Sequence, residues 1–273
     1  MPDLRYQPKS RIKPESTYLQ VVRKNVTSQN GEDGIIERVF SMIGASNKWC
    51  VEFGAWDGKH LSNTWNLVVN KGWRGVYIEG HPGRFEKLCR THGDNERAVL
   101  AQRFINLSGE DTLDAVLAET PAPLDLDLIS IDVDGQDWHI WRSLERFRPR
   151  VVVIEFNYSI PNDVYYVQDP DPNVHEGSSL LATIELGKAK GYELIATTTL
   201  NAFFVAKELF DQFQIEDNDI DAMHSPGKYE FKLFQLYDGT LVLTGCQRLL
   251  WPNIPIEQED IQVLPPEQRR FKG

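Results

Sequence analysis

Short apolar runs alternate with segments of helical periodicity along most of the chain. Each apolar run predicts a buried strand, and the runs lie at residues 49–58, 75–83, 98–105, 126–135 and 150–157. The segments with helical periodicity lie at residues 28–44, 83–92, 113–119, 138–147 and 178–191. Strands that are apolar throughout and separated by helices are typical of a parallel sheet covered on both faces. We therefore predict a doubly wound α/β fold.

The last part of this region changes the predicted sheet. The helix over 178–191 ends at Gly191, a residue type that commonly closes helices. Two strand-like runs, 192–199 and 201–209, then follow with a short link between them. A short link joins antiparallel strands, whereas parallel strands need a long crossover. The parallel sheet is therefore predicted to end in an antiparallel pair, and residues 28–206 form the predicted core.

Both ends of the chain differ from this core. Residues 1–27 are polar, rich in proline and without a period, which indicates an N-terminal arm. Residues 207–273 form a predicted C-terminal extension packed on the core, with a β-hairpin centred on Asp238-Gly239, a strong turn signal. Residues 157–177 form a long loop after the fifth strand. Loops of that length are usually functional lids or disordered.

Composition narrows the possible partners. The chain has 273 residues and a formal net charge of -11, which argues against binding to a nucleic-acid backbone. Its three cysteines are scattered and show no metal-binding spacing, so we expect reduced thiols in a cytoplasmic protein. No apolar run approaches the ~18 residues of a membrane span, and the N-terminus lacks the apolar core of a signal peptide. The oligomeric state is left open.

Carboxylates follow four of the predicted strands. They are Glu52 with Asp57, Glu79, Asp132 with Asp134, and Glu155. In doubly wound sheets, ligands bind beyond the carboxyl ends of the strands, where these side chains are expected to meet. Converging like charges repel unless a ligand or cation compensates. One interpretation is a shared site, and the other is that some of these residues cap helices or pair with lysine and arginine.

The turn after the first strand, "VEFGAWDG", favours a cationic ligand. Gly54 and Gly58 allow a ligand to approach the backbone closely. Dinucleotide sites use a glycine-rich turn so that a helix N-terminus can hold a pyrophosphate. Asp57 in the middle of this turn suits instead an ammonium or sulfonium group, such as that of S-adenosylmethionine. Ser62 and Asn63 can then bond the carboxylate of that ligand, or they can cap a helix.

Glu79 ends the second predicted strand, about 25 positions after Gly54. An acidic residue about 20 positions after the glycine turn commonly bonds the hydroxyl groups of a ribose. Nicotinamide and S-adenosylmethionine folds share this signal, so it does not separate them.

Asp132 and Asp134 end the fourth strand two positions apart, so an extended chain would place them on the same side. Because two adjacent carboxylates resist double ionisation, the pair can act as a general base. With Glu155 it can also bind Mg²⁺, which prefers carboxylate and water oxygens. We predict that Asp137 caps the following helix. His139 is a second candidate base, although a surface histidine is the simpler interpretation.

Residues after the fifth strand are candidates for binding a substrate. Asn157 can bond substrate hydroxyl groups, and Tyr158 and His175 lie in the long loop over the same edge of the sheet. Aromatic loop residues can stack on sugars, but exposed loop tyrosines are also common without a ligand.

Six motifs occur in the order found in FkbM-type methyltransferases. They are "SQNGED", "VEFGAWDG", "GWRGVYIEGHPGRFEKL", "TLDAVL", "DLISIDVDGQD" and "NAFFV", spread over residues 28–206. The chain therefore resembles this family, which implies a class I, Rossmann-like methyltransferase fold with seven strands, the last antiparallel. The resemblance also implies S-adenosylmethionine-dependent O-methylation of sugars, glycans or natural products. The substrate would then be a small molecule or a glycan.

The resemblance implies roles for individual residues. Glu52, Gly54, Ala55 and Asp57 correspond to the cofactor turn, Glu79 to the ribose ligand, and Gln29 to a Ser-Gln motif expected near the cofactor. Asp132 and Asp134 fall where the family has Asp-Val-Glu-Gly, and Asp134 is one methylene shorter than the family's glutamate. Residues 207–273 have no counterpart in the family pattern.

Two other functions compete with this interpretation. One is a nicotinamide-dependent enzyme, against which the chemistry of the first turn argues. The other is a non-catalytic module that keeps the methyltransferase fold as an interaction scaffold, since a fold does not fix a function. A pure scaffold would gain stability by losing the acidic strand ends, and this chain retains them.

Overall fold

A seven-stranded sheet forms the centre of the computed structural model, which describes residues 11–271. The strands are β1 Trp49–Phe53, β2 Arg74–Ile78, β3 Ala98–Ala101, β4 Leu128–Ile131, β5 Val151–Glu155, β6 Tyr192–Thr197 and β7 Asn201–Ala206. Their order is β3-β2-β1-β4-β5-β7-β6, and β7 runs antiparallel to both of its neighbours. The predicted doubly wound sheet of seven strands, with the last strand antiparallel, is therefore confirmed.

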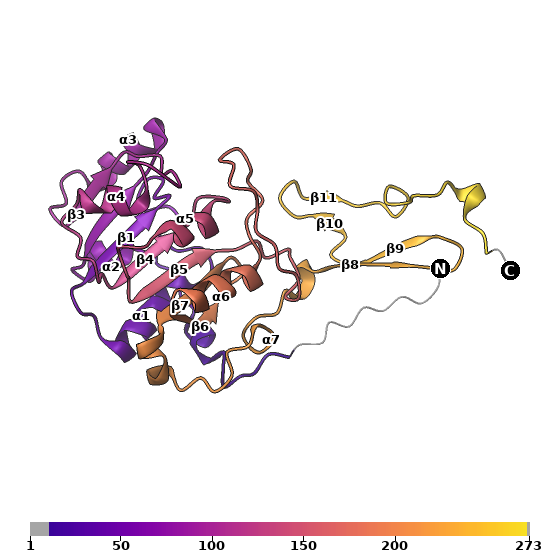
Figure 1. Ribbon diagram of the computed structural model, residues 1–273, viewed down its shortest axis with the longest axis horizontal. Coiled ribbons are helices and arrows are strands. Elements are labelled where there is room, and N and C mark those ends of the chain that lie inside the picture. The colour runs from indigo at the N-terminus through magenta and orange to yellow at the C-terminus, as the bar shows by residue number, and fades with distance from the viewer. Residues whose placement is uncertain (1–10, 272–273) are drawn as a thin grey trace.

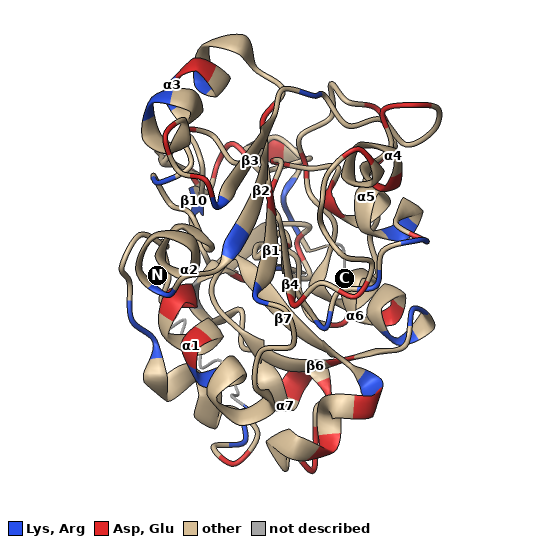
Figure 2. Cartoon of the chain, turned by 90° about the vertical axis from the view of Figure 1, so that its left-hand side faces the viewer, with Lys and Arg blue, Asp and Glu red and all other residues tan. Residues whose placement is uncertain are grey.

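Helices cover both faces of the sheet, as Figure 2 shows with the sheet between two layers. The helices are α1 Glu32–Ile43, α2 Trp65–Asn70, α3 Pro82–His92, α4 Leu113–Ala118, α5 Asp137–Ser143, α6 Leu180–Ala189 and α7 Ile220–Met223. Helices α1, α2 and α3 lie on one side of the sheet, and α4, α5 and α6 lie on the other (Figure 2). This is the doubly wound arrangement that the alternating strands and helices predict.

The core lies where the central strands meet these layers. Strands β1 and β4 are buried at every position, as expected for strands that are covered on both faces. Trp141 of α5 is fully buried and packs against Phe204 of β7, with ring centroids 4.9 Å apart. Large apolar side chains buried in this way each contribute about 1.5–3 kcal/mol to the stability of the fold.

The first helix begins later than its sequence suggests. The helical periodicity begins at residue 28, but α1 starts at Glu32, after Gly31 with φ 96°. The Ser28 hydroxyl still accepts a hydrogen bond from the amide of Asp33, at 3.1 Å. The Asp33 carboxylate in turn accepts bonds from the amides of residues 26–28. These bonds fold the preceding chain back over the helix start.

The predicted arm and extension are only partly packed on the core. In the arm, the 3-10 helix η1 (Tyr18–Val22) buries Leu19, while residues 1–10 lie outside the described part. The extension first packs against the body through the 3-10 helix η2 (Lys207–Phe213), which buries Phe213. From residue 231 onward the extension projects away from the body (Figure 1), except at a turn that returns to the body and packs Trp251 against Tyr158.

That projecting part contains the predicted hairpin. It comprises β8 Phe231–Gln235 and β9 Leu241–Gly245, followed by a short second pair, β10 Arg248–Leu249 with β11 Ile254–Pro255. Two short 3-10 helices, η3 Gly227–Tyr229 and η4 Pro266–Gln268, flank these strands. Among residues 11–271, no helix has the length and apolar character needed to cross a bilayer.

Candidate functional site

A cavity of about 700 Å³ opens at the carboxyl ends of β1, β2, β4 and β5. It lies at the point where the strand order reverses, between β1 and β4, which is where ligands bind in doubly wound sheets. Its size is that of a small-molecule or cofactor site. At one end the wall is made by Phe104 and Ile105, which follow β3, and at the other by Tyr158 and Trp251. Glu79, Asp132 and Glu155 line the space between them.

The turn after β1 approaches the end of β4 very closely. Gly54 has φ 79°, and a Cβ atom at this position would lie 1.7 Å from the carbonyl oxygen of Asp132. The amides of Gly54 and Ala55 both donate to the carbonyl of Ile78, each at 3.1 Å. The turn is therefore fixed between two strands, and Gly54 and Ala55 form part of the cavity wall.

Glu52 holds the segment that follows this turn. Its carboxylate accepts hydrogen bonds from the Ser62 hydroxyl at 2.5 Å, the Asn63 amide at 2.7 Å and the Thr64 hydroxyl at 3.0 Å. Burial raises the pKa of Glu52 to about 7, although these three bonds oppose the shift. Glu52, Ser62 and Asn63 all line the cavity. Their polar atoms mostly bond one another and so position the wall of the cavity. The sequence had instead predicted that these residues contact a ligand directly.

Asp57 does not occupy the predicted place beside a ligand. One of its carboxylate oxygens accepts bonds from the amides of Lys59 at 2.9 Å and His60 at 2.7 Å. Asp57 is also absent from the residues that line the cavity. The carboxylate accepts amides of its own turn, as aspartate side chains often do. The oxygen used in this way is less available to a ligand.

Glu79 reaches the cavity with acceptor capacity to spare. Its carboxylate accepts the amide of Trp56 at 2.9 Å and the amide of His81 at 2.7 Å, one on each oxygen. A carboxylate has about four acceptor positions, so two remain for a ligand. Gln29, which is exposed, lines the same cavity. The structure thus brings Glu79 and Gln29 to one space, as predicted for a pair of cofactor contacts.

Three carboxylates meet at the ends of β4 and β5. One oxygen each from Asp132, Asp137 and Glu155 lie within 4.8 Å of one another, a spacing that can hold a metal ion. The predicted metal set had Asp134 in place of Asp137. Asp134 is exposed and has φ 57°, so the chain leaves the extended conformation immediately after β4. Asp132 and Asp134 therefore do not point to the same side of the chain. Asp137, at the start of α5, lies beside Asp132 and Glu155 instead.

Asp137 joins this cluster but does not cap α5 as predicted, because Gln136 is the N-cap and Asp137 is the first residue of the helix. It is buried, and its two oxygens accept the amides of Val133 and Gly135, each at 2.9 Å. Those bonds fix the loop after β4. Each oxygen keeps a further acceptor position, and one of the two oxygens lies within 4.8 Å of an oxygen of Asp132 and of Glu155.

The three carboxyl groups cannot all be ionised together. Burial, and then the charge of Asp132, raise the pKa of Glu155 well above its ordinary value. Burial, and then the charge of Asp134, raise the pKa of Asp132 to about 6, although Asp132 is open to water in the cavity and that water weakens the effect. Within residues 11–271, none of the three forms an ion pair with lysine or arginine. At neutral pH, Glu155 therefore keeps its proton and Asp132 is the anion.

This cluster predicts that the protein loses stability as the pH rises. The pKa of Asp137 is also raised, to about 7, by burial and by Asp132. Because the folded-state pKa values exceed the unfolded ones, the native state binds more protons between pH 4 and pH 7, and its stability falls over that window. We expect the free energy of unfolding to fall by on the order of 2 kcal/mol between pH 5 and pH 7.5, measured by thermal unfolding at constant ionic strength.

Glu52 titrates in the same direction, so a variant must isolate the cluster. Asp132→Asn removes one carboxylate and should reduce the fall in stability, while Glu52 continues to contribute. Millimolar Mg²⁺ should raise the unfolding temperature of the wild type at pH 7.5 more than that of Asp132→Asn. Equal pH profiles for the two proteins would contradict the electrostatic account of the cluster.

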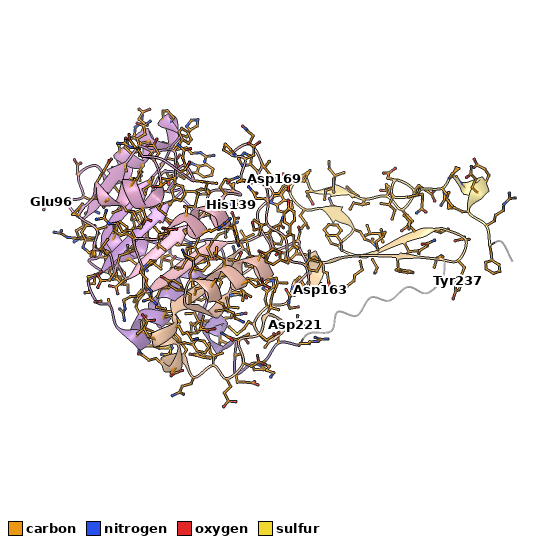
Figure 3. The ribbon with its side chains drawn as sticks, viewed as in Figure 1. Glu96, His139, Asp163, Asp169, Asp221 and Tyr237 are labelled. Atoms are coloured by element: carbon orange, nitrogen blue, oxygen red, sulfur yellow. The ribbon has the colours of Figure 1, made fainter. Side chains whose placement is uncertain are left out.

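His139 is not placed to act as a base. It is buried, its Nε2 lies 2.7 Å from the carbonyl oxygen of Gln168, and it does not line the cavity. Figure 3 shows His139 in the body and Asp169 on the adjacent long loop. The expectation of a surface histidine is also wrong, because the ring is covered by the loop that it anchors.

The long loop over 157–177 is held in place by Gln168. The Gln168 side chain accepts the amides of Glu176 and Gly177 and donates to the carbonyl of Val174. Asn157, a predicted substrate contact, donates instead to the carbonyl of Glu176 at 2.6 Å and lines a smaller neighbouring cavity. The loop therefore has a built internal structure, and Asn157 belongs to it.

Tyr158 and His175 do line the main cavity, as predicted for substrate contacts. The His175 ring lies 3.0 Å from the carbonyl oxygen of Asp134, through Nδ1. Tyr158 packs on two residues of the C-terminal extension, with ring centroids 4.8 Å from Tyr229 and 5.6 Å from Trp251. Sequence reasoning missed Trp251, Phe104 and Ile105. Phe104 and Ile105 are the last residues of the predicted strand over 98–105, a position that could have indicated them, but nothing in the sequence marks Trp251.

Comparisons with known proteins give only remote similarities. The sequence matches no protein-family model and no curated protein. Among solved structures, the citrinin polyketide synthase CMeT domain aligns with a TM-score of 0.43 and 10% identity, covering 64% of this chain and 51% of that one. The N-terminal domain of EvdMO1 with SAH bound aligns with a TM-score of 0.40 and 16% identity, covering 66% and 81%.

A SAM-dependent methyltransferase from Aquifex aeolicus aligns with a TM-score of 0.37 and 12% identity, covering 62% of this chain and 87% of that one. The present chain thus spans about half of the citrinin synthase domain. Similarities this remote say nothing about the substrate.

Proposed function

We propose that this chain is an S-adenosylmethionine-dependent O-methyltransferase of the FkbM type that acts on a hydroxyl group of a sugar, glycan or related small metabolite. The observation that carries the proposal is a single cavity that joins Glu79 to the carboxylates Asp132 and Glu155 at the switch point of the sheet. A ribose ligand and a proton acceptor are both needed for this reaction, and both line one space. The ordered FkbM motifs support the same assignment.

The cavity fits S-adenosylmethionine along its length. Phe104 and Ile105 offer an apolar wall for an adenine ring, and Glu79 has two acceptor positions left for ribose hydroxyls. The close approach of Gly54 to β4 leaves backbone, and no side chain, at this position of the wall. When bound, S-adenosylmethionine supplies a methyl group that its sulfonium already activates. The protein then has mainly to align the acceptor and remove a proton.

Asp132 is the residue that we assign to removing that proton. A sugar hydroxyl is a poor nucleophile, so its proton has to leave as the new bond to carbon forms. Asp132 is anionic at neutral pH, is open to the cavity, and stands beside a protonated Glu155. Glu155 can donate a hydrogen bond to Asp132 and so fix its orientation, while Asp137 is held by two amides.

The same three carboxylates fit a hard divalent cation such as Mg²⁺. Their oxygens lie close enough to bind one ion together, and carboxylates with water are the ligands that Mg²⁺ prefers. When bound, Mg²⁺ would lower the pKa of a coordinated hydroxyl and orient a vicinal diol. We therefore propose Asp132, Asp137 and Glu155 as the metal ligands, in place of the set expected from the sequence.

The acceptor is proposed to lie at the end of the cavity opposite Phe104. Tyr158, His175 and Trp251 line that end next to the carboxylates. Trp251 is 66% exposed, so the part of its ring that Tyr158 does not cover can contact the apolar face of a sugar or a planar ring. Trp251 belongs to the extension without a family counterpart, which makes it a candidate for acceptor selectivity.

Calorimetric titration with S-adenosylhomocysteine, with and without Mg²⁺, tests the proposal. We expect micromolar binding to the wild type, a loss of about 10-fold or more in Glu79→Gln, and a metal-dependent change if the carboxylates hold Mg²⁺. The unfolding temperature of Glu79→Gln serves as a control, because Glu79 also accepts two amides of the turn. Binding of NADH without S-adenosylhomocysteine would favour a nicotinamide-dependent enzyme. No binding of either by folded protein would favour the scaffold.

A further inference from the structure

Glu32 is a buried carboxylate that takes no part in the proposed proton transfer or metal binding. It is the first residue of α1, and its exposed fraction is 0%. One of its oxygens accepts the amide of Asn30 at 2.6 Å. The other accepts the Thr198 hydroxyl at 2.7 Å and the Asn201 side-chain amide at 3.3 Å. Because all three partners donate, and because the start of a helix favours a negative charge, Glu32 is held as an anion inside the protein.

The carboxylate of Glu32 is held next to the wall of the main cavity. Its partner Asn30 directly follows Gln29, which lines the cavity. Its partner Asn201 lies opposite Glu155 in the pairing of β5 with β7, and Glu155 lines the cavity as well. The negative charge therefore lies close behind two residues of the wall, without being exposed in the cavity itself.

No ion pair cancels this charge. Among residues 11–271, no lysine or arginine forms a salt bridge with Glu32. Burial lowers the pKa of Arg23, and the charge of Glu32 opposes that shift. Burial first, then Asp134 and more weakly Glu32, raise the pKa of Asp132 in the cavity. A buried charge is screened far less than an exposed one, so that of Glu32 acts across the wall.

The other buried carboxylates around the cavity do not supply a permanent charge. Burial is the main cause that raises the pKa of Glu52 and of Asp137, each to about 7. Burial also raises the pKa of Glu155 well above its ordinary value. These three groups are partly or wholly protonated at neutral pH. Glu32 differs from them because three donors hold it as an anion, and because it is not one of the proposed metal ligands.

We propose that the charge of Glu32 raises the affinity of the cavity for S-adenosylmethionine relative to S-adenosylhomocysteine; this inference rests on the proposed function. The two ligands differ only at sulfur, which carries a methyl group and a positive charge in the first and neither in the second. Methyl transfer leaves the electron pair of the broken bond on sulfur, and the acceptor proton passes to Asp132. The product is thus a neutral thioether that Glu32 no longer attracts, which favours its release.

Calorimetric titration of Glu32→Gln tests the proposal without turnover. Glutamine keeps the size of the side chain and removes its charge. We expect the affinity for S-adenosylmethionine to fall about 10-fold, while that for S-adenosylhomocysteine changes less than about 2-fold. Sinefungin, which carries an ammonium group in place of the sulfonium, should follow S-adenosylmethionine. A loss of wall structure alone would weaken all three ligands together, so the ratio of the affinities identifies the effect of charge.

Asp127→Asn is the matched control for the loss of a buried carboxylate. Asp127 is also 0% exposed, accepts the amides of residues 46–48, and pairs with Arg150 at 2.6 Å. It directly precedes β4, so it lies at the edge of the sheet opposite the cavity. Both variants should lower the unfolding temperature, but Asp127→Asn should leave the ratio of the affinities unchanged.

Arg23→Gln tests the same charge with Glu32 and its bonds intact, and it serves if Glu32→Gln does not fold. Arg23 does not line the main cavity. Removing its positive charge should raise the affinity for S-adenosylmethionine relative to S-adenosylhomocysteine about 2-fold to 3-fold. Equal losses of both ligands in folded Glu32→Gln, or an unchanged ratio in Arg23→Gln, would overturn the proposal. If the folded wild type bound neither ligand, the proposed function itself would fail.

Discussion

Asp132→Asn is expected to lower methyl transfer by about 10³-fold while the affinity for S-adenosylhomocysteine changes less than about 2-fold. Asparagine keeps the size of the side chain but cannot accept a proton from a hydroxyl group. The carboxylate of Asp132 is open to the cavity, and burial with the charge of Asp134 raises its pKa to about 6. Turnover and calorimetry on the same protein preparation separate the loss of chemistry from a loss of cofactor binding.

Asp134→Asn is the matched comparison for this prediction. Asp134 lies two positions away, also lines the cavity, and adopts a left-handed conformation that asparagine tolerates as well as aspartate does. We expect it to retain most of the turnover. A loss confined to Asp134→Asn, with near-normal turnover in Asp132→Asn, would transfer the role of base to Asp134. The wild-type rate should rise with pH through about 6, as Asp132 loses its proton.

The sheet could be predicted from the sequence because its strands are apolar throughout. A strand that is buried on both faces requires apolar residues at every position. The residues Val151–Ile154 are buried, and in the sequence they form an unbroken apolar run. The antiparallel end of the sheet could be read from the short link before Asn201. Once the strands were placed, Glu79, Asp132 and Glu155 followed as neighbours, because parallel strands bring their carboxyl ends to one edge.

The individual roles around those strand ends were less predictable, since they depend on local backbone turns. The rule that residues two apart share a side fails at Asp134, where φ becomes positive. Asp57 satisfies amides of its own turn, and His139 is covered by a loop that folds back from residue 168. No periodic pattern encodes these contacts.

Trp251 shows a second limit of sequence reasoning. It is more than ninety residues from Tyr158 in the chain but packs against it at the mouth of the cavity. Neither residue lies on a repeating apolar pattern that would pair them. Such contacts arise from the tertiary path of the extension, which the sequence indicates only as far as the turn at Asp238-Gly239.

Gly54→Ala is expected to destabilise the protein by on the order of 4 kcal/mol or more, an exceptional value for one methyl group. The φ angle of 79° already disfavours alanine, and the new Cβ would meet the carbonyl oxygen of Asp132 at 1.7 Å. That oxygen belongs to backbone at the end of β4, so it cannot move away without separating β1 from β4. The damage should therefore reach the cavity, and the affinity for S-adenosylhomocysteine should fall in any protein that still folds.

Gly72→Ala separates the two causes. Gly72 has φ 71°, close to that of Gly54, but nothing lies within 4 Å of the position that a Cβ would take. Its substitution should lower the free energy of unfolding by only about 1–2 kcal/mol, the cost of placing alanine in a left-handed backbone conformation. Urea unfolding of the three proteins gives both values, and the difference between the variants measures the close approach of the turn to β4. Equal losses at the two positions would show that the turn after β1 can relax away from Asp132, and the cavity wall would then not depend on glycine at position 54.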